Sequence, residues 1–260
     1  MDSRGNKRIA AVIQYCGTEF RGFQIQKTGR TVQGEMERAL KILFSETVPV
    51  VGSGRTDSGV HALYQVIHFD IPENCNLKIL ARSLNGILEK DVAVKEIYSV
   101  NNDFHSRYDA IEREYTYLIY NNIHRSPFFS GRAHWETSEI DITYFLKVLN
   151  YIKGTHDFSS FCKKKSSDCN NVRSIHDIIL KKENNLISVV ITGSSFLHNM
   201  IRIIIGTAIM MHRAGDIPEK ILEIMECRTR EAAGPTASAC GLYLSNVKYS
   251  PELFNRSKIS

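Results

Sequence analysis

The densest group of residues able to do chemistry is the segment Gly52–Ala62, which reads GSGRTDSGVHA. It places a carboxylate, Asp57, two residues after Arg55, in a stretch that holds three glycines. Glycine permits positive φ values and close approach of a ligand to the backbone, so such a turn can present Asp57 to a cleft. An ionised carboxylate there can act as a nucleophile or as a general base. The spacing also fits a tight turn in which Asp57 only caps backbone amides, and the pattern leaves both interpretations open.

Two other kinds of chemistry lack support. The segment has neither the Gly-Lys-Ser/Thr ending nor the following helix of a phosphate-binding P-loop, which argues against a nucleoside triphosphate substrate. The six cysteines contain no CxxC pair and the histidines no HExxH motif, so we expect no metal site. The histidines considered are His61, His68, His105, His156 and His198.

The elements that would position this segment follow from hydrophobic periodicity. Apolar residues alternate over Arg8–Tyr15 and recur at helical spacing over Val32–Phe44, which predicts a strand, a loop and a helix at the start of the chain. Further strands are predicted at Val48–Gly52, Ala62–Asp70, Val92–Val100, Glu114–Tyr120, Ile175–Lys181, Leu186–Thr192 and Gly241–Tyr249, and further helices at Ile79–Ile87, Ile142–Ile152, Leu197–Ala214 and Pro218–Met225.

The order of these elements roughly repeats along the chain. Two successive series of this kind predict an α+β fold of two related α/β sandwich domains, each with a mainly antiparallel sheet covered by helices on one face. We place an N-terminal domain at residues 1–107, carrying Asp57, and a C-terminal domain at 108–260, with the active-site cleft between them.

Charge and hydropathy set the cellular expectations. The 33 basic and 28 acidic residues give a formal charge of +5, which permits a polyanionic partner but is also common among soluble enzymes. The first residues lack the apolar stretch of a secretory signal. The apolar run Met200–Met211 carries Arg202 and is shorter than the ~20 residues that a membrane-spanning helix needs. We therefore expect a cytoplasmic protein without a membrane segment.

The motif GRTDSGVHA resembles the signature of TruA-type pseudouridine synthases, in which the aspartate is the catalytic residue. The resemblance extends over nearly the whole chain. It departs at Cys16, Phe23 and Ser238, where aspartate, tryptophan and proline are expected, and none of these touches the proposed chemistry. The matching segments include Phe104–Arg107, Arg113–Tyr117, His156–Phe161, Phe196–Arg202, Gly234–Ala237 and Gly241–Leu244.

This resemblance implies a tRNA pseudouridine synthase that isomerises uridines 38, 39 and 40 of the anticodon stem-loop and works as a homodimer. The reaction breaks the N1 glycosidic bond and rejoins the base through C5, without redox change or an outside atom, so no cofactor is expected. The resemblance assigns Asp57 as the catalytic carboxylate, Arg202 as the cation that keeps it charged, and Tyr115 as the residue that stacks on the uracil and takes part in proton transfer.

Each assignment has a rival from the residue pattern. An arginine inside an apolar helix must find an acceptor, but Arg202 could instead extend its charge to solvent. Tyr117 shares a strand face with Tyr115, and only the resemblance ranks Tyr115 first. Arg55 is suited to occupy the space left by an extruded uridine, although a structural salt bridge would also explain it.

Contacts to RNA phosphates are expected from two basic stretches, although a lysine run is often only a solvated loop. Rival functions are a catalytically silent tRNA-binding or folding factor and the same isomerase acting on another RNA. The candidate phosphate contacts are Arg21, Lys27 and Arg30 on the early loop, and Lys163, Lys164, Lys165 and Arg173 later in the chain.

Overall fold

The structure is a computed structural model that describes residues 5–163 and 170–251. Residues Arg113–Leu242 form one compact unit, and the chain before them forms another together with the segment from Tyr243 onward. The domain boundaries predicted from the sequence, 1–107 and 108–260, stay a prediction. The compact units differ from them in that the C-terminal strand joins the first unit.

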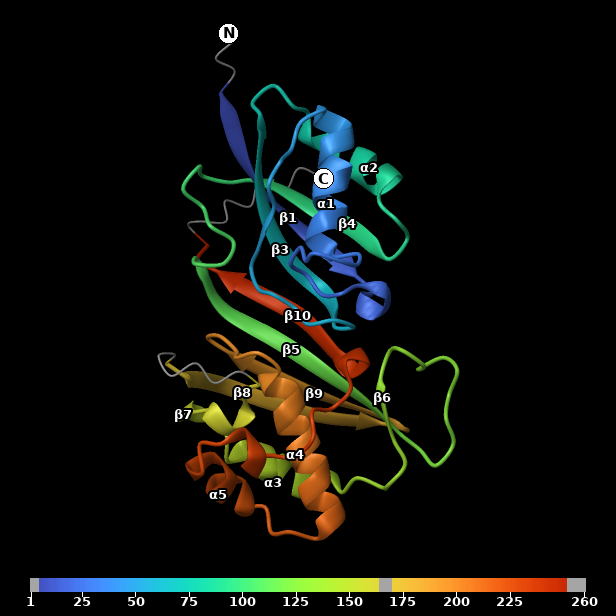
Figure 1. Ribbon diagram of the computed structural model, residues 1–260, viewed down its shortest axis with the longest axis vertical. Coiled ribbons are helices and arrows are strands. Elements are labelled where there is room, and N and C mark those ends of the chain that lie inside the picture. Colours follow the sequence, from blue (N-terminus) through green and yellow to red (C-terminus); the bar gives the residue numbers. More distant parts are fainter. Residues whose placement is uncertain (1–4, 164–169, 252–260) are drawn as a thin grey trace. The chain divides into compact units, whose positions relative to one another are not determined.

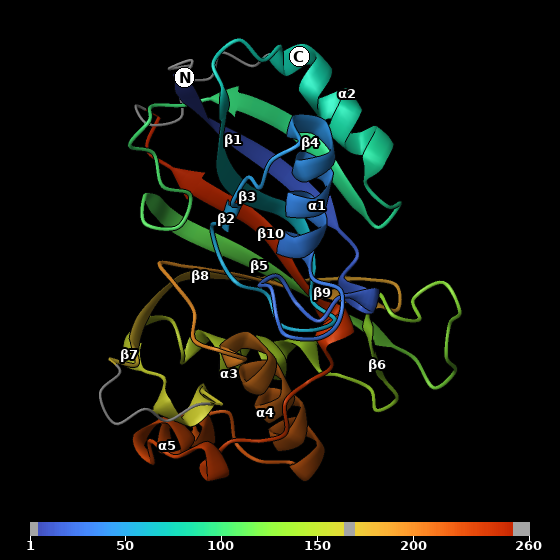
Figure 2. The ribbon, with the colours of Figure 1, turned by 45° about the horizontal axis from the view of Figure 1, so that its top comes forward.

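The first unit is built on a sheet with the strand order β4-β1-β3-β10. The residues Ile9 to Ile13 of β1 are at most 1% exposed, as expected for a central strand covered on both faces. The strand β1 pairs antiparallel with β3 and β4, whereas β10 pairs parallel with β3. Figures 1 and 2 show α1 and α2 side by side over these strands. The elements are β1 (Asn6–Tyr15), α1 (Val32–Phe44), β2 (Val51–Gly52), β3 (His61–Pro72), α2 (Leu77–Ile87), β4 (Val92–Ser99) and β10 (Leu242–Tyr249).

The helix α1 shows how local sequence sets these elements. The Thr31 side chain caps its start by accepting a hydrogen bond from the Gly34 amide, and Ser45 ends it in the left-handed conformation with φ 58°. Met36, Ala39 and Leu40 are buried at helical spacing. The predicted bounds, Val32–Phe44, are confirmed.

The second unit has the strand order β5-β9-β8-β7, all antiparallel, with the short strand β6 parallel to β5. Its helices α3, α4 and α5 lie together on one side of the strands in Figure 1. The register pairs Tyr115 of β5 with Ile191 of β9. The elements are β5 (Ala110–Asn121), β6 (His134–Glu136), α3 (Ile142–Asn150), β7 (Gly154–Asp157), β8 (Val172–Glu183), β9 (Leu186–Gly193), α4 (Met200–Ala214) and α5 (Lys220–Glu226).

The described part of the chain is thus a mixed α/β protein with mainly antiparallel strands and five α-helices, which confirms the predicted class at this level. Among the described residues, none of the helices has the length and apolar character needed to cross a membrane. Two strands, β6 and β7, were not predicted. The helix α4 begins at Met200 rather than at Leu197 because Asn199 is left-handed, with φ 61°.

The buried histidine of β3 makes the stability of the first unit dependent on pH. His68 is 6% exposed, and its burial, aided by the charges of Arg8 and His105, lowers its pKa to about 4; the acidic neighbours Asp70 and Asp109 oppose this. An unfolded histidine has a pKa of about 6.5, so between pH 6.5 and 4 the unfolded state binds a proton that the folded state does not. As the pH decreases from 6.5 to 4, we therefore expect the free energy of unfolding to fall by up to about 3 kcal/mol.

Urea denaturation between pH 4 and 7 measures this effect. The variant His68→Asn does not titrate there and keeps a side-chain acceptor, so its free energy of unfolding should depend less steeply on pH than that of the wild type. Carboxylates that do not interact with His68 contribute equally to both proteins, so the difference between the two slopes reports His68 together with its charge coupling to Asp70 and Asp109. Parallel slopes would show that His68 does not carry this effect.

Candidate active site

The loop between β2 and β3 carries Asp57 and Arg55. Thr56 and Val60 are buried, Asp57 is half-buried and Arg55 is exposed. The Val60 amide donates to the Asp57 carbonyl at 3.1 Å, and Gly59 turns the chain with φ 79°. The loop therefore anchors itself through Thr56 and Val60 and leaves Asp57 and Arg55 able to meet a ligand.

A second segment, Cys16–Phe23, braces this loop and is called the clamp segment below. The Phe23 amide donates to the Thr56 carbonyl at 3.1 Å, and the Gly59 amide donates to the Phe20 carbonyl at 3.3 Å. Just before the clamp segment, the Tyr15 hydroxyl is hydrogen bonded to Thr56 Oγ1 at 2.8 Å in the core. These bonds flank Asp57 on both sides and fix the backbone that carries it.

Two glycines let the clamp segment approach so closely. A β-carbon on Gly17 would lie 1.9 Å from the Val60 carbonyl oxygen, and one on Gly22 would lie 2.8 Å from the Thr56 oxygen. Gly22 also has φ 97°, which strains any other residue. The Gly17 amide donates to His61 Nδ1 at 3.1 Å. The position of the Asp57 loop thus depends on the absence of side chains at both glycines.

We expect Gly17→Ala to impair activity severely, because Val60 and the loop before it must move to admit the methyl group. A displacement of about 1 Å at a reacting group can cost on the order of 10²-fold in rate, and the overpacking costs about 1–3 kcal/mol of stability. Steady-state assays and thermal unfolding measure the two effects. In α2, Gly86 has open space around its missing β-carbon, so Gly86→Ala is the control that should keep full activity. A fully active Gly17→Ala enzyme would contradict the role of the clamp segment.

The second unit distinguishes two tyrosines of β5 that the sequence pattern could not rank. Tyr117 is fully buried, its hydroxyl donates to the Ser238 carbonyl at 2.8 Å, and burial raises its pKa far above the usual value. Tyr115 is half-buried, and its ring meets Phe196 edge-to-face with centroids 5.2 Å apart. Tyr117 is therefore a core residue, while Tyr115 has surface with which to contact a ligand.

Arg202 lies in the first turns of α4, half-buried, with its guanidinium held by acceptors of the protein. Its Nε donates to the Ala237 carbonyl at 2.9 Å, and Nη1 donates to Asn199 Oδ1 at 2.7 Å. The Ala237 amide in turn donates to the Arg202 carbonyl at 3.0 Å. This geometry orients the side chain, in contrast with a charge that simply extends into solvent.

The segment that supplies the Ala237 carbonyl, Gly234–Ser238, packs closely against α4. A β-carbon on Gly206 would lie 1.9 Å from the Pro235 carbonyl oxygen, and the Gly234 amide donates to Thr207 Oγ1 at 2.9 Å. These contacts hold the segment in place, so the Arg202 side chain has a fixed support.

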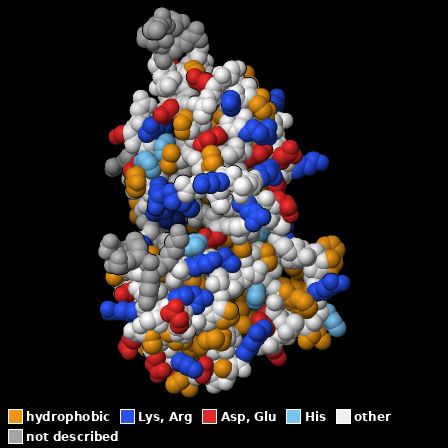
Figure 3. All heavy atoms as spheres, in the orientation of Figure 1, with side chains coloured by type: hydrophobic (Ala, Val, Ile, Leu, Met, Phe, Trp, Pro, Cys, Tyr) orange, Lys and Arg blue, Asp and Glu red, His pale blue; other side chains and the backbone are white. Residues whose placement is uncertain are grey.

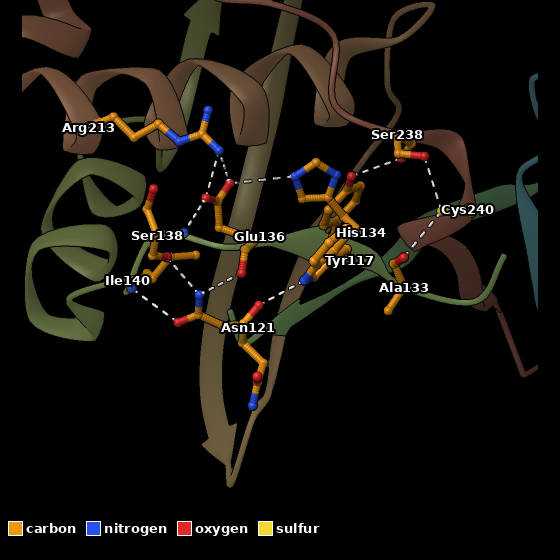
Figure 4. A network of polar contacts seen from close by, with 12 residues as sticks. Tyr117, Asn121, Ala133, His134, Glu136, Ser138, Ile140, Arg213, Ser238 and Cys240 are labelled. Carbon is orange, nitrogen blue, oxygen red and sulfur yellow. Dashed lines mark hydrogen bonds and ion pairs between the residues drawn. The ribbon is translucent and has the colours of Figure 1, made fainter. Parts of the chain in front are cut away.

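A partly buried polar network extends from this segment into β5 and β6 (Figure 4). Glu136 is 1% exposed and accepts two hydrogen bonds from Arg213, at 2.6 and 2.7 Å. Although its burial acts to raise the pKa of Glu136, the hydrogen bonds from Arg213 and from the Ser138 amide hold it below the usual value. The Asn121 side chain donates to the Glu136 and Ser138 carbonyls, so this network fixes the short strand β6.

The residues predicted to contact RNA phosphates differ in their exposure and in the partners that they already have. Arg21, Lys27 and Lys163 are exposed. The Arg30 guanidinium binds Asp91 in a bidentate pair at 2.6 and 2.9 Å and stacks over a phenyl ring, so two partners already hold it.

Later in the chain, Arg173 Nη1 donates to the carbonyls of Asn170 and Val172. Lys164 and Lys165 lie outside the described residues. On the face drawn in Figure 3, basic and acidic side chains are interspersed.

Sequence reasoning missed several residues that support the candidate site. Asn199, the clamp glycines and the Ala237 carbonyl were not assigned roles, because their contacts join residues far apart in the sequence. An asparagine directly before an apolar helix was the one local signal. Within residues 5–163 and 170–251, no group of three or more histidine, cysteine or acidic side chains could hold a metal ion.

A mixed α/β fold with a braced carboxylate loop defines a candidate enzyme site, and the comparisons identify its class. A family model described as tRNA pseudouridine synthase matches residues 11–109 and 149–250. The chain belongs to the tRNA pseudouridine synthase family, and it is therefore an isomerase.

Relatives named tRNA pseudouridine synthase A match along nearly their whole length. The protein from Bacillus subtilis is 39% identical over 93% of this chain and 99% of its own. That from Acetivibrio thermocellus is 39% identical over 94% and 100%. Among solved structures, an archaeal box H/ACA sRNP Nop10-Cbf5 complex matches with a TM-score of 0.37 at 10% identity, over 92% of this chain and 48% of that one.

Proposed function

We propose that this chain converts uridine to pseudouridine at positions 38, 39 and 40 of the tRNA anticodon stem-loop, with Asp57 as the catalytic carboxylate. The observation that carries the proposal is the Asp57 loop, braced by the clamp segment and presenting Asp57 beside the exposed Arg55. The match with relatives named tRNA pseudouridine synthase A over nearly their full length supports tRNA as the substrate.

The conversion of uridine to pseudouridine requires a carboxylate in a fixed position and few other groups. The bond between C1′ and N1 breaks, the base turns, and a bond forms between C1′ and C5; the proton lost from C5 is balanced by one gained at N1. Asp57 can serve as the nucleophile or as the base in this exchange. Because the steps are internal to one nucleotide, they need no electron acceptor and no second substrate.

The target base must leave its stack before it can react, at a cost of a few kcal/mol. Arg55 is exposed two residues before Asp57, and its planar guanidinium is suited to fill the vacated space. We propose that Tyr115 stacks on the extruded uracil. The orientation of Arg202 by Asn199 and Ala237 supports its proposed role as the cation that keeps the carboxylate ionised.

The finer expectations from the resemblance belong to the same proposal. They are two related sandwich domains with an active-site cleft, a homodimer and a cytoplasmic location. Gel filtration at micromolar concentration tests the oligomer, and a monomer alone would contradict the homodimer.

The decisive experiment incubates the purified protein with an unmodified tRNA transcript that carries uridines at 38 to 40, without metal or nucleotide, and maps pseudouridine along the RNA. Product at those positions is the expected result. Tight binding of the tRNA without any product would replace the proposal with a binding or folding factor, and product at other positions would change the substrate.

A further inference from the structure

A stacked aromatic pair stands on the surface of the first unit, in the loop after β4. The Tyr108 side chain is 77% exposed. Its ring stacks on His105 with centroids 4.2 Å apart and an interplanar angle of 30°. The Arg107 guanidinium carbon lies 6.0 Å from the centre of the Tyr108 ring. We call His105, Arg107 and Tyr108 the aromatic platform.

The platform is held rigid by its own backbone. His105 Nδ1 accepts from the amides of Arg107 and Tyr108, each at 3.2 Å. The His105 amide donates to Asp109 Oδ2 at 2.7 Å, and the Asp109 amide donates to the His105 carbonyl at 3.1 Å. The His105 ring is therefore fixed, and the Tyr108 ring rests on it.

A single buried serine anchors the same loop to the sheet. Ser106 is 0% exposed; its amide donates to His68 Nδ1 at 3.1 Å and its hydroxyl donates to the Val51 carbonyl at 2.9 Å. The Tyr249 hydroxyl of β10 donates to the Ser106 carbonyl at 2.6 Å. The conformational entropy of ordering this loop is thus already lost before any ligand arrives, which favours binding.

An exposed ring with a fixed orientation and a neighbouring guanidinium fits a ligand that has both an aromatic face and a negative charge. An unpaired nucleotide has both: the base stacks on the ring and the phosphate meets the arginine. Val51 is also the first residue of β2, the strand that leads into the Asp57 loop. Asp57 lies six positions after Val51, a stretch that spans at most ~20 Å when extended, so platform and carboxylate can reach the same RNA.

We propose that the aromatic platform binds an unpaired nucleotide of the RNA substrate other than the reacting uridine, by stacking its base on Tyr108. This inference rests on the proposed function in taking tRNA as the RNA. It adds a site for a second nucleotide, in the same unit as Asp57, that contributes affinity and register rather than chemistry.

The test measures binding of an anticodon stem-loop RNA to the full chain carrying Asp57→Asn, so that turnover does not enter. In this background, Tyr108→Leu should raise Kd about 10-fold, within the roughly 5- to 150-fold range that loss of one stacked base gives. Tyr108→Phe and Tyr108→Trp keep an aromatic face and should bind as the background does. Phe128 of the second unit is 89% exposed, and Phe128→Leu is the matched control that should leave Kd unchanged.

The stacked base is then located with RNAs that carry one abasic nucleotide each. At one position, removal of the base should raise the Kd of the Asp57→Asn background protein about 10-fold. The same RNA should bind the Tyr108→Leu variant no more weakly than the intact RNA does. Equal Kd values for Tyr108→Leu and the background, additive losses at every position, or no measurable binding of the RNA would each overturn the proposal. Failure of the proposed function would instead appear as absence of pseudouridine with the wild-type protein.

Discussion

Asp57→Asn should abolish pseudouridine formation, with an expected loss of about 10⁴-fold in rate, while the fold and the affinity for tRNA should stay nearly unchanged. Asparagine has nearly the shape of aspartate but cannot form an ester or accept a proton as a carboxylate does. The loop itself is held by Thr56, Val60 and the clamp segment, so the substitution should not displace it. Single-turnover assays with mapped product, beside a thermal unfolding curve, measure both parts of the prediction.

A matched substitution in the same unit controls for general effects of removing a carboxylate. Asp70 pairs with Arg8 at the surface at 2.8 Å, and such exposed pairs contribute about 0–1 kcal/mol. Asp70→Asn should therefore keep nearly full activity. Retained turnover in Asp57→Asn would remove Asp57 from the catalytic role.

Arg202→Met should lower the rate by about 10²- to 10³-fold. The size is that of losing one positioned charge-stabilising group. Single-turnover rates under saturating enzyme measure this loss, and a thermal unfolding curve shows whether the fold is kept.

The variant Arg202→Lys separates charge from geometry. Lysine keeps the positive charge but not the planar fork by which Arg202 binds the Ala237 carbonyl and Asn199. The rate of Arg202→Lys should fall below that of the wild type but stay above that of Arg202→Met. An unchanged rate in Arg202→Met would instead favour the interpretation that the charge only meets solvent.

Hydrophobic periodicity predicted the long elements well. The helix α1 was placed with its observed bounds, and the strands β1, β3, β8 and β9 were found with shifts at their ends. The long apolar stretches carry many repeats of the pattern, so chance alternation has little effect on them. The short strands β6 and β7 offer three and four residues, too few for a period to be recognised.

The supports of the candidate site were harder to predict because they depend on contacts between distant residues. The hydroxyl of Tyr117 donates to a carbonyl 121 positions away, and nothing local in β5 separates this tyrosine from Tyr115. The need for glycine at position 17 is likewise set by Val60 rather than by its own neighbours. Tyr115 and Tyr117 are told apart only by their burial in the structure, and the requirement at Gly17 only by its contact with Val60.

The parallel pairing of β10 with β3 also determines when, during translation, the sheet beside the Asp57 loop can be completed. Tyr243 pairs with His61 and stacks on its ring at 4.6 Å, two positions after Gly59 of the Asp57 loop. These contacts cannot form until the ribosome has translated the residues of β10, which follow the whole second unit in the sequence. Contacts of such large sequence separation form slowly. A nascent chain therefore holds its carboxylate loop beside an incomplete sheet for most of its synthesis, and competence to act on RNA should arise late rather than domain by domain.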